Sequence, residues 1–240
     1  MASLEQKTAL VDKYCNAHRE WVQNAEMHQR NYDSAMSDYA SANQRANSAQ
    51  YELDRLYDQM SSAEAEMRNV ESELNSLNDG QEHSASEYQY LRSRLEAARN
   101  SYMDAQRQIG PVQGQLQQAQ GEARQAYLVA QQESQQYEQA QANVEKCCQA
   151  LEQMSAQLSQ EADVLQMQVN SESSYASTLQ GASGNMFANS ALAAAGRLQA
   201  SASTKQAELT GTQALIDRIH QELNGGDSTA SMGAKVLRRR

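Results

Sequence analysis

The sequence is poor in the residues that build a wide globular core. Its 240 residues include one Phe, one Trp and one Pro, and the 40% counted as hydrophobic includes 37 alanines. Domains of this size normally bury many Leu, Ile, Val and Phe side chains. The shortage disfavours a compact enzyme fold. The near absence of proline and the abundance of Ala, Gln and Glu favour long helices.

Cysteine, long apolar runs and a secretion signal are also lacking. Three cysteines in so long a chain do not make a disulfide framework. No apolar run approaches the roughly 20 residues of a membrane span. Residues 1–7 have neither the basic region nor the apolar core of a signal peptide. We therefore expect a cytoplasmic protein, with signal-independent export as the alternative.

The motifs of common enzymes are absent as well. The sequence has no glycine-rich phosphate loop, no Gly-x-Ser-x-Gly elbow and no His-Glu-x-x-His motif. Paired carboxylates such as Glu64 and Glu66 stand on a predicted helix without a pocket and indicate a solvated face. The formal net charge of −10 disfavours nucleic acid and anionic membrane surfaces as general partners. We predict a non-enzymatic protein without a cofactor.

A seven-residue repeat of apolar residues is the main positive feature. The first repeat covers residues 4–77, and its a and d positions include Val11, Ala25, Leu56 and Val70. A period of 3.5 residues kept over ten heptads predicts a left-handed coiled coil. The segment Asn78-Asp79-Gly80 is suited to end this helix.

A second repeat covers residues 88–165, and a third, richer in alanine, covers residues 188–223. The only proline, Pro111, falls inside the second repeat. Proline normally kinks or ends a helix. Because Ile109, Val112 and Leu116 keep the heptad phase across it, we favour a kink within one helix. The alternative is a turn at 110–111, which would give four helices.

These repeats predict an all-α fold, an elongated antiparallel coiled coil of about three long helices. A helical hairpin is formed by residues 3–78 and 82–180, kinked near Pro111, and a shorter third helix covers 186–224. The short turn at 79–81 pairs residue i with about residue 162−i, uncertain by one heptad. The third helix folds back on the second. Residues 1–224 are predicted to be a single domain, and 225–240 a flexible basic tail.

The predicted register brings Cys15 opposite Cys147 and Cys148, with His18 one helical turn away. Four such ligands in one layer fit a tetrahedral zinc site. A disulfide from Cys15 to Cys147 or Cys148 is a second interpretation. The simplest is that Cys147 is a small core residue at a d position and the other two cysteines flank it, since cytosolic thiols usually stay reduced.

Polar seam residues and off-seam aromatics are the other candidates. His18 and His28 occupy seam positions, where they form either pH-sensitive contacts or a loosely packed, partly exposed layer. Lys7, Glu133 and Glu161 indicate layers that are wet or meet a charged partner. Four tyrosines outside the seam are candidate interaction residues: Tyr51, Tyr57, Tyr90 and Tyr127.

One basic cluster lies at the C-terminus and contains Lys235, Arg238, Arg239 and Arg240. It is either a docking segment for an acidic protein face, nucleic acid or a membrane surface, or a solubilising tail.

The layout of these predicted helices resembles several groups of long-helix proteins. It is similar to BAR-type membrane-bending modules in length, kinked helices and three-helix antiparallel build. It is similar to phage-shock and ESCRT-type proteins in its long first hairpin, and to helical pore-forming toxins in its elongated bundle. These resemblances imply a protein that remodels or enters membranes, with residues 186–198 as the apolar candidate segment.

Three functional hypotheses follow. The first is a coiled-coil scaffold that self-associates into a filament or larger assembly, because an alanine-rich two-helix seam buries little area. The second is the membrane-remodelling or membrane-inserting protein. The third is a partner-binding adaptor or secretion-associated protein.

Overall fold

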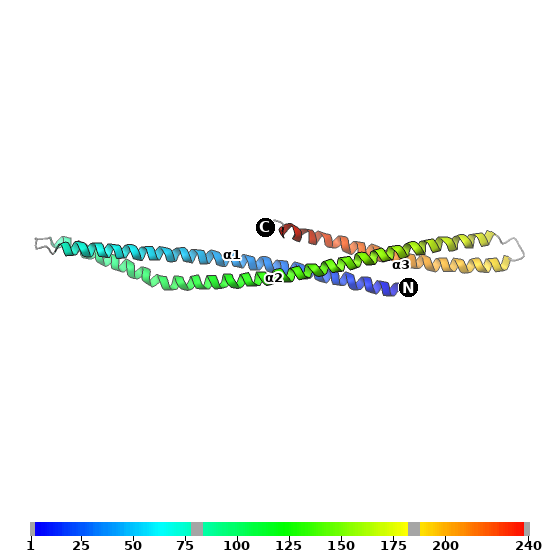
Figure 1. Ribbon diagram of the computed structural model, residues 1–240, viewed down its shortest axis with the longest axis horizontal. Helices are drawn as coiled ribbons and strands as arrows, with labels where there is room; N and C mark the ends of the chain where they lie inside the picture. Colours follow the sequence, from blue (N-terminus) through cyan, green and yellow to red (C-terminus); the bar gives the residue numbers. More distant parts are fainter. Residues whose placement is uncertain (1–2, 78–83, 182–187, 238–240) are drawn as a thin grey trace. The chain divides into compact units, whose positions relative to one another are not determined.

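The computed structural model describes residues 3–77, 84–181 and 188–237, and in those ranges it contains three helices and no strand (Figure 1). They are α1 (Leu4–Ser76), α2 (Ala85–Gly181) and α3 (Ala188–Leu237). The helices pack against one another, so the predicted all-α fold is confirmed. The turn predicted at 78–80 lies outside the described residues.

The chain divides into two compact units, which are described separately. Unit 1 consists of residues 1–29 and 135–240, and unit 2 consists of residues 30–134. Both α1 and α2 contribute to each unit, whereas α3 belongs to unit 1.

Local sequence signals explain where α1 and α2 begin. The backbone N–H of Gln6 donates to the Ser3 hydroxyl, and the Ser3 N–H donates to the Gln6 side chain. Ser84 and Glu87 repeat the same reciprocal pair at the start of α2. These are capping boxes, which satisfy two of the free N–H groups at a helix start.

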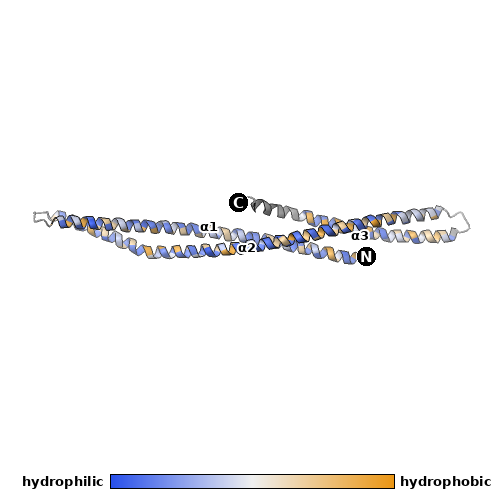
Figure 2. Cartoon of the chain, in the orientation of Figure 1, coloured by the Kyte–Doolittle hydropathy of each residue, from blue (hydrophilic) through white to orange (hydrophobic). Residues whose placement is uncertain are grey.

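The heptad pattern agrees with the burial of α1 and α2. All the a and d positions identified from Leu4 to Leu77 and from Tyr88 to Leu165 are buried or half-buried. Figure 2 shows hydrophobic residues recurring among hydrophilic ones along each helix. The e positions flank this seam on one side and the g positions on the other, and we call these two sides the e edge and the g edge.

Contacts between α1 and α2 define their antiparallel register. In unit 2, the hydrogen-bonded pairs Asn31–Glu133, Gln59–Ser101 and Tyr57–Gln113 have residue numbers that sum to 164, 160 and 170. The predicted sum of about 162 is therefore correct to about one heptad. At the end of the hairpin, the Tyr88 hydroxyl donates to the Leu77 carbonyl over 3.0 Å.

The helix α2 continues through Pro111, so the alternative of a turn and a fourth helix is wrong. Figure 1 shows α2 bending in its first third, the part that contains this residue. A proline ring displaces the carbonyl four residues earlier and removes one hydrogen bond, which bends a helix that packing holds together on both sides.

The third helix extends further than predicted, to Leu237 instead of residue 224. Gly225 and Gly226 lie inside it. Each glycine costs a helix about 1 kcal/mol relative to alanine, which weakens it without stopping it. No proline follows, and residues such as Ala230, Met232 and Ala234 are compatible with helix. Whether the chain is one domain stays a prediction.

The seam of unit 2 has a leucine-containing part and an alanine-rich part. Leu53, Leu56, Ala105 and Val112 form a buried cluster. Elsewhere alanines are buried opposite alanines: Ala35, Ala42 and Ala46 on α1, and Ala119, Ala123 and Ala130 on α2. A buried leucine contributes about 2 kcal/mol and an alanine much less, so this part of the hairpin is held by a thin seam.

In unit 1 all three helices share a core. Its buried residues come from α1, from α2 and from α3: Val11, Cys15, Leu151, Leu158, Ala162, Leu165, Leu209, Leu215, Ile216 and Ile219. Paired residues rise together in number between α1 and α3, as in Asp12–Arg218 and His18–Glu222. The two helices therefore run parallel, and α2 runs antiparallel to both. The predicted folding back of the third helix onto the second is confirmed.

Candidate functional site

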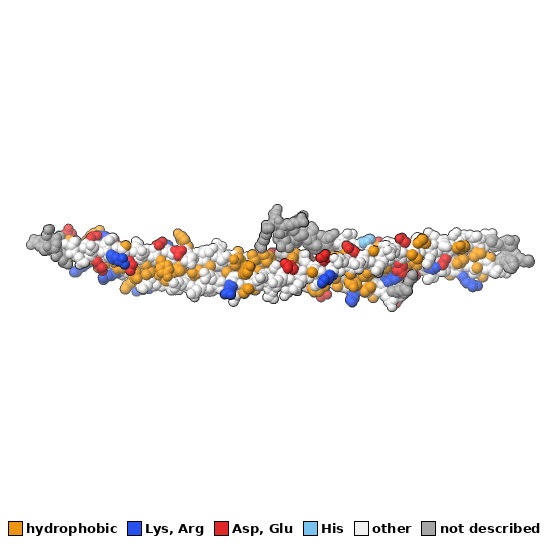
Figure 3. Space-filling view, viewed as in Figure 1, with side chains coloured by type: hydrophobic (Ala, Val, Ile, Leu, Met, Phe, Trp, Pro, Cys, Tyr) orange, Lys and Arg blue, Asp and Glu red, His pale blue; other side chains and the backbone are white. Residues whose placement is uncertain are grey.

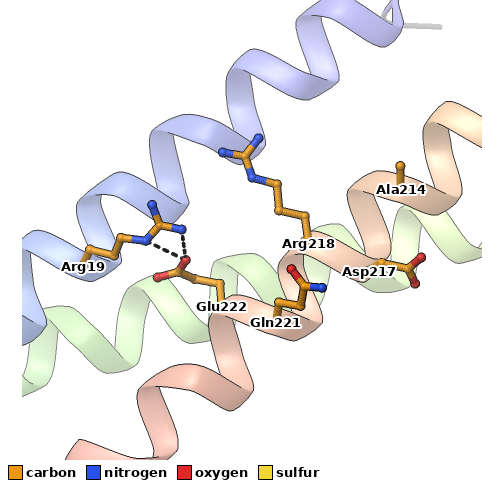
Figure 4. A pocket seen from close by; sticks show the side chains of 6 residues that line it. All are labelled: Arg19, Ala214, Asp217, Arg218, Gln221 and Glu222. Carbon is orange, nitrogen blue, oxygen red and sulfur yellow. Dashed lines mark hydrogen bonds and ion pairs between the residues drawn. The ribbon is translucent and has the colours of Figure 1, made fainter.

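A polar layer joins α1 to α3 in unit 1 and centres on Glu222. Its carboxylate lies 3.1 Å from His18 Nδ1. It also accepts a hydrogen bond of 2.8 Å from Arg19 Nε, with a second contact from the Arg19 guanidinium (Figure 4). The side chains of His18 and Glu222 are 4% and 9% exposed, whereas Arg19 is 55% exposed. One buried carboxylate therefore accepts from two basic side chains on α1.

These contacts set the charge state of Glu222. Burial by itself raises the pKa of the carboxyl, but the hydrogen bonds from Arg19 and His18 outweigh it, and the net pKa is lowered. Glu222 is thus held as a carboxylate near neutral pH. His18 is buried at 3% exposure, so the expectation of a partly exposed layer at this position is wrong. The helix α3 packs on α1 and covers the His18 side chain.

Further polar pairs surround this layer. Asp12 Oδ1 is buried and lies 2.5 Å from Arg218 Nη1 as an ion pair without an aligned hydrogen bond. Lys7 Nζ lies 2.6 Å from the Glu161 carboxylate. The charged partner predicted for each of these two seam residues is therefore the other one. The Ser155 hydroxyl lies 3.2 Å from His220 Nε2. Such pairs fix the register of helices more than they add stability.

A shallow hollow beside this layer is lined by Arg19, Ala214, Asp217, Arg218, Gln221 and Glu222. Figure 4 shows Arg218 and Glu222 projecting from α3 toward α1. In the hollow Arg19 pairs with Glu222, and Arg218 pairs with Asp12 of α1. It brings together no nucleophile with an adjacent base, which covalent or acid–base catalysis would require.

The cysteines behave as core residues. Cys15 and Cys147 are buried free thiols, and Cys148 is half-buried. Because Cys15 is a free thiol, neither disulfide that the register allowed is formed. Burial raises the pKa of the Cys15 thiol and of the Cys147 thiol. Within the described ranges, no three or more His, Cys, Asp or Glu residues are placed to hold a metal ion.

The four candidate tyrosines all lie at the surface of unit 2. Tyr51, Tyr57, Tyr90 and Tyr127 are 75%, 47%, 63% and 52% exposed. The Tyr127 ring contacts the ring of Tyr39, with centroids 5.7 Å apart. Tyr39 occupies an a position of the predicted seam. It is half-buried there and also makes this aromatic contact.

Two of these tyrosines have polar neighbours. The Tyr57 hydroxyl accepts from the Gln113 amide over 3.2 Å, and the Arg94 guanidinium lies 5.7 Å from the centre of the Tyr90 ring. Tyr57 and Tyr127 occupy e positions, whereas Tyr90 lies on the side of the g edge. The structure therefore separates the four tyrosines onto different sides of the hairpin.

The other candidates are distributed elsewhere. His28 and Trp21 are half-buried in unit 1, and Trp21 packs against Tyr137 and Ala140. Arg238, Arg239 and Arg240 lie outside the described residues, as does the side chain of Lys235. The basic cluster stays a prediction.

Sequence reasoning missed the partners of the polar layer: Asp12, Arg19, Arg218 and Glu222. A signal was present, because Arg218 and Glu222 interrupt the apolar stripe formed by Leu215, Ile216, Ile219 and Leu223. Charged residues beside a seam suggest complementary charges on a neighbouring helix.

No helix in the described part of the chain combines the length and the apolar character that crossing a bilayer requires. Comparison with known proteins gives no match to a family model, to a curated protein or to a solved structure.

Proposed function

We propose that this protein is a non-enzymatic coiled-coil scaffold whose copies associate with one another. The observation that carries the proposal is the construction of unit 2. Its described part is a hairpin of two helices whose seam is alanine-rich over residues 35–49 and 119–130, and aromatic side chains lie outside this seam.

Two helices with such a seam bury little apolar area. Isolated two-helix hairpins gain stability mainly from large a and d side chains, and these are scarce over residues 35–49 of α1 and 119–130 of α2. In the part of Figure 3 that shows unit 2, hydrophobic side chains reach the surface along the hairpin. A further layer of helices from another copy would bury this area without any change in the hairpin.

The polar layer of unit 1 supports a structural role. Its charged groups form pairs between α1 and α3, and these pairs hold α3 in one register on α1. A scaffold needs this kind of defined register, because each copy must present the same surface to the next.

Sedimentation velocity of the full chain between about 1 and 200 µM tests the proposal, since the interface expected here is of modest size. The sedimentation coefficient is expected to rise with concentration, and electron micrographs of the concentrated protein should show particles larger than one chain. A coefficient that stays at the monomer value over the whole range would refute self-association.

A further inference from the structure

The e edge of the hairpin has two different environments along the chain. In unit 1 the e positions of α2 from residue 155 to residue 176 are covered: Ser155, Ala162, Val169 and Ala176 are buried. Ser155 contacts His220 of α3, and Ala162 packs in the core with Leu209. In unit 1, therefore, α3 packs on the e edge, while Leu10 and Val164 at g positions stay exposed.

In unit 2 the e edge is open to solvent. Asn43, Gln50 and Tyr57 of α1 are exposed at e positions. So are Gln106, Gln113, Gln120 and Tyr127 of α2. We call the surface formed by e positions 36–57 of α1 and 106–127 of α2 the open e edge.

The open e edge carries no formal charge at any of its e positions. On α1, the three charged residues between 34 and 53 are Asp38, Arg45 and Glu52, and all three are g positions. On α2, residues 108–121 contain no charged residue. Between residues 34 and 53 the charges of α1 thus lie on the g edge, where Arg45 pairs with Glu122. Asp54 and Arg124, at b positions, border the open e edge, and Asp54 accepts a hydrogen bond from Gln50.

The side chains of the open e edge are those that interfaces favour. Tyr39 and Tyr127 contact each other at one end, and Tyr57 lies at the other. Tyr39 and Asn43 also line a shallow groove that continues onto the outer face of α1 as far as Tyr51. Tyrosine supplies contact area together with a hydroxyl, and the amides between these rings can both donate and accept hydrogen bonds.

We infer that the open e edge binds the same surface of a second copy of this chain around a two-fold axis. This inference rests on the proposed self-association and names the surface that performs it. The distribution of charge identifies a second copy of the chain as the binding partner. The chain carries a net charge of −10, so two copies repel wherever carboxylates meet. The e positions of two open e edges meet without placing like charges opposite each other.

The dimensions agree with a specific but modest interface. The stretch 36–57 is about 33 Å long at 1.5 Å per residue, and two helices are about 20 Å wide. Each copy would bury about 600 Å², or about 1,200 Å² in total, at the lower limit of stable interfaces. The product is a four-helix layer. In it the hairpin of the second copy covers the e edge of unit 2, as α3 covers the e edge in unit 1.

The test is a pair of matched double variants in the full chain. Gln113→Glu with Gln120→Glu adds two charges to the open e edge. Gln115→Glu with Gln125→Glu adds the same charges at exposed positions on the g edge side of α2. All four changes keep side-chain size and helix propensity. Sedimentation velocity gives the dissociation constant, and circular dichroism reports helix content.

The e-edge variant is expected to weaken association by at least about 100-fold while keeping its helix content, because each interface would then bury four like charges. The g-edge variant should stay within about threefold of the parent. A Gln113→Lys/Gln120→Lys variant mixed with the e-edge Glu variant should restore association as a heterodimer.

The outcomes separate the two proposals. A parent protein that stays monomeric refutes self-association and this surface with it. A parent that associates, with an e-edge variant that associates equally well or a g-edge variant that dissociates, overturns the surface and leaves self-association standing.

Discussion

At the scale of single residues, Glu222 concentrates the polar interactions between α1 and α3. It is nearly buried and accepts from His18 and Arg19 together. Removing its charge leaves a buried imidazole and a guanidinium without an anionic acceptor. The same residue therefore allows the contribution of the polar layer to be measured.

We expect Glu222→Gln to lower the free energy of unfolding by about 1–2 kcal/mol, the range for a charge-assisted hydrogen bond with one exposed partner. Urea unfolding followed by circular dichroism at pH 7 measures it. Glu152→Gln, at an exposed position of α2, is the matched control and should change stability by less than about 0.5 kcal/mol. Equal effects of the two changes would contradict a special role for Glu222.

The pH dependence of this difference has a defined sign. The pKa of Glu222 lies below its ordinary value of 4.5. A depressed carboxyl pKa contributes stability that is fully present above the unfolded value and is lost as the pH falls through the folded one. The stability gap between the parent and Glu222→Gln should therefore be full above about pH 4.5 and shrink below it. A gap that widens on acidification would contradict this assignment.

The burial of two thiols predicts slow labelling by thiol reagents. In a Cys148→Ser variant, the remaining Cys15 and Cys147 are buried, and burial raises the pKa of each thiol. A thiol reagent such as dithionitrobenzoate should label them at least about 100-fold more slowly than in urea, because labelling requires local opening. Rapid labelling of two thiols in the folded protein would show that this core is open.

At the scale of helices, the glycines of α2 weaken a segment that packing must hold. Gly110, Gly114 and Gly121 flank Pro111, and a Cβ added at any of the three would meet nothing within 4 Å. Gly211 of α3 differs, because its Cβ would lie 2.5 Å from Leu4 Cδ2. The two classes of glycine separate helix propensity from close packing.

Gly114→Ala is expected to stabilise the protein by about 1 kcal/mol, the difference in helix propensity. Gly211→Ala should stabilise it less or destabilise it, because the Leu4 side chain must move. Thermal unfolding of both variants by circular dichroism measures this contrast. Equal gains would mean that the contact between Gly211 and Leu4 imposes no constraint on α3.

At the scale of the whole molecule, net charge and the proposed open e edge act in opposite directions. A net charge of −10 keeps copies apart, while the proposed interface contains no ion pair at its e positions. Salt shortens the range of the repulsion from about 20 Å at 20 mM to about 6 Å at 300 mM and leaves apolar contacts largely intact.

Self-association should therefore strengthen as salt rises from about 20 to 300 mM, across which repulsion is screened. Sedimentation velocity at fixed protein concentration measures the change. Assembly through ion pairs would behave in the opposite way, so weakening by salt would argue against an uncharged interface.

Much of the fold follows from the sequence, because a heptad repeat is a local property. The spacing of Val11, Leu56, Leu91 and Leu151 determines which face of each helix is buried, and the capping boxes determine where α1 and α2 begin. The short connection after α1 makes the hairpin antiparallel. These features depend on neighbours within a few residues or across one seam.

Tertiary structure decided what lies outside the seam. Heptads leave α3 free to pack on the e edge or the g edge, and packing placed it on Cys15, Ser155 and Ala162. That choice buried His18 against Glu222, more than two hundred residues away. It also buried Cys15, which stands at an e position outside the seam. The seam is fixed by the period of one helix, whereas the third helix and the charges it covers depend on how three helices fit together.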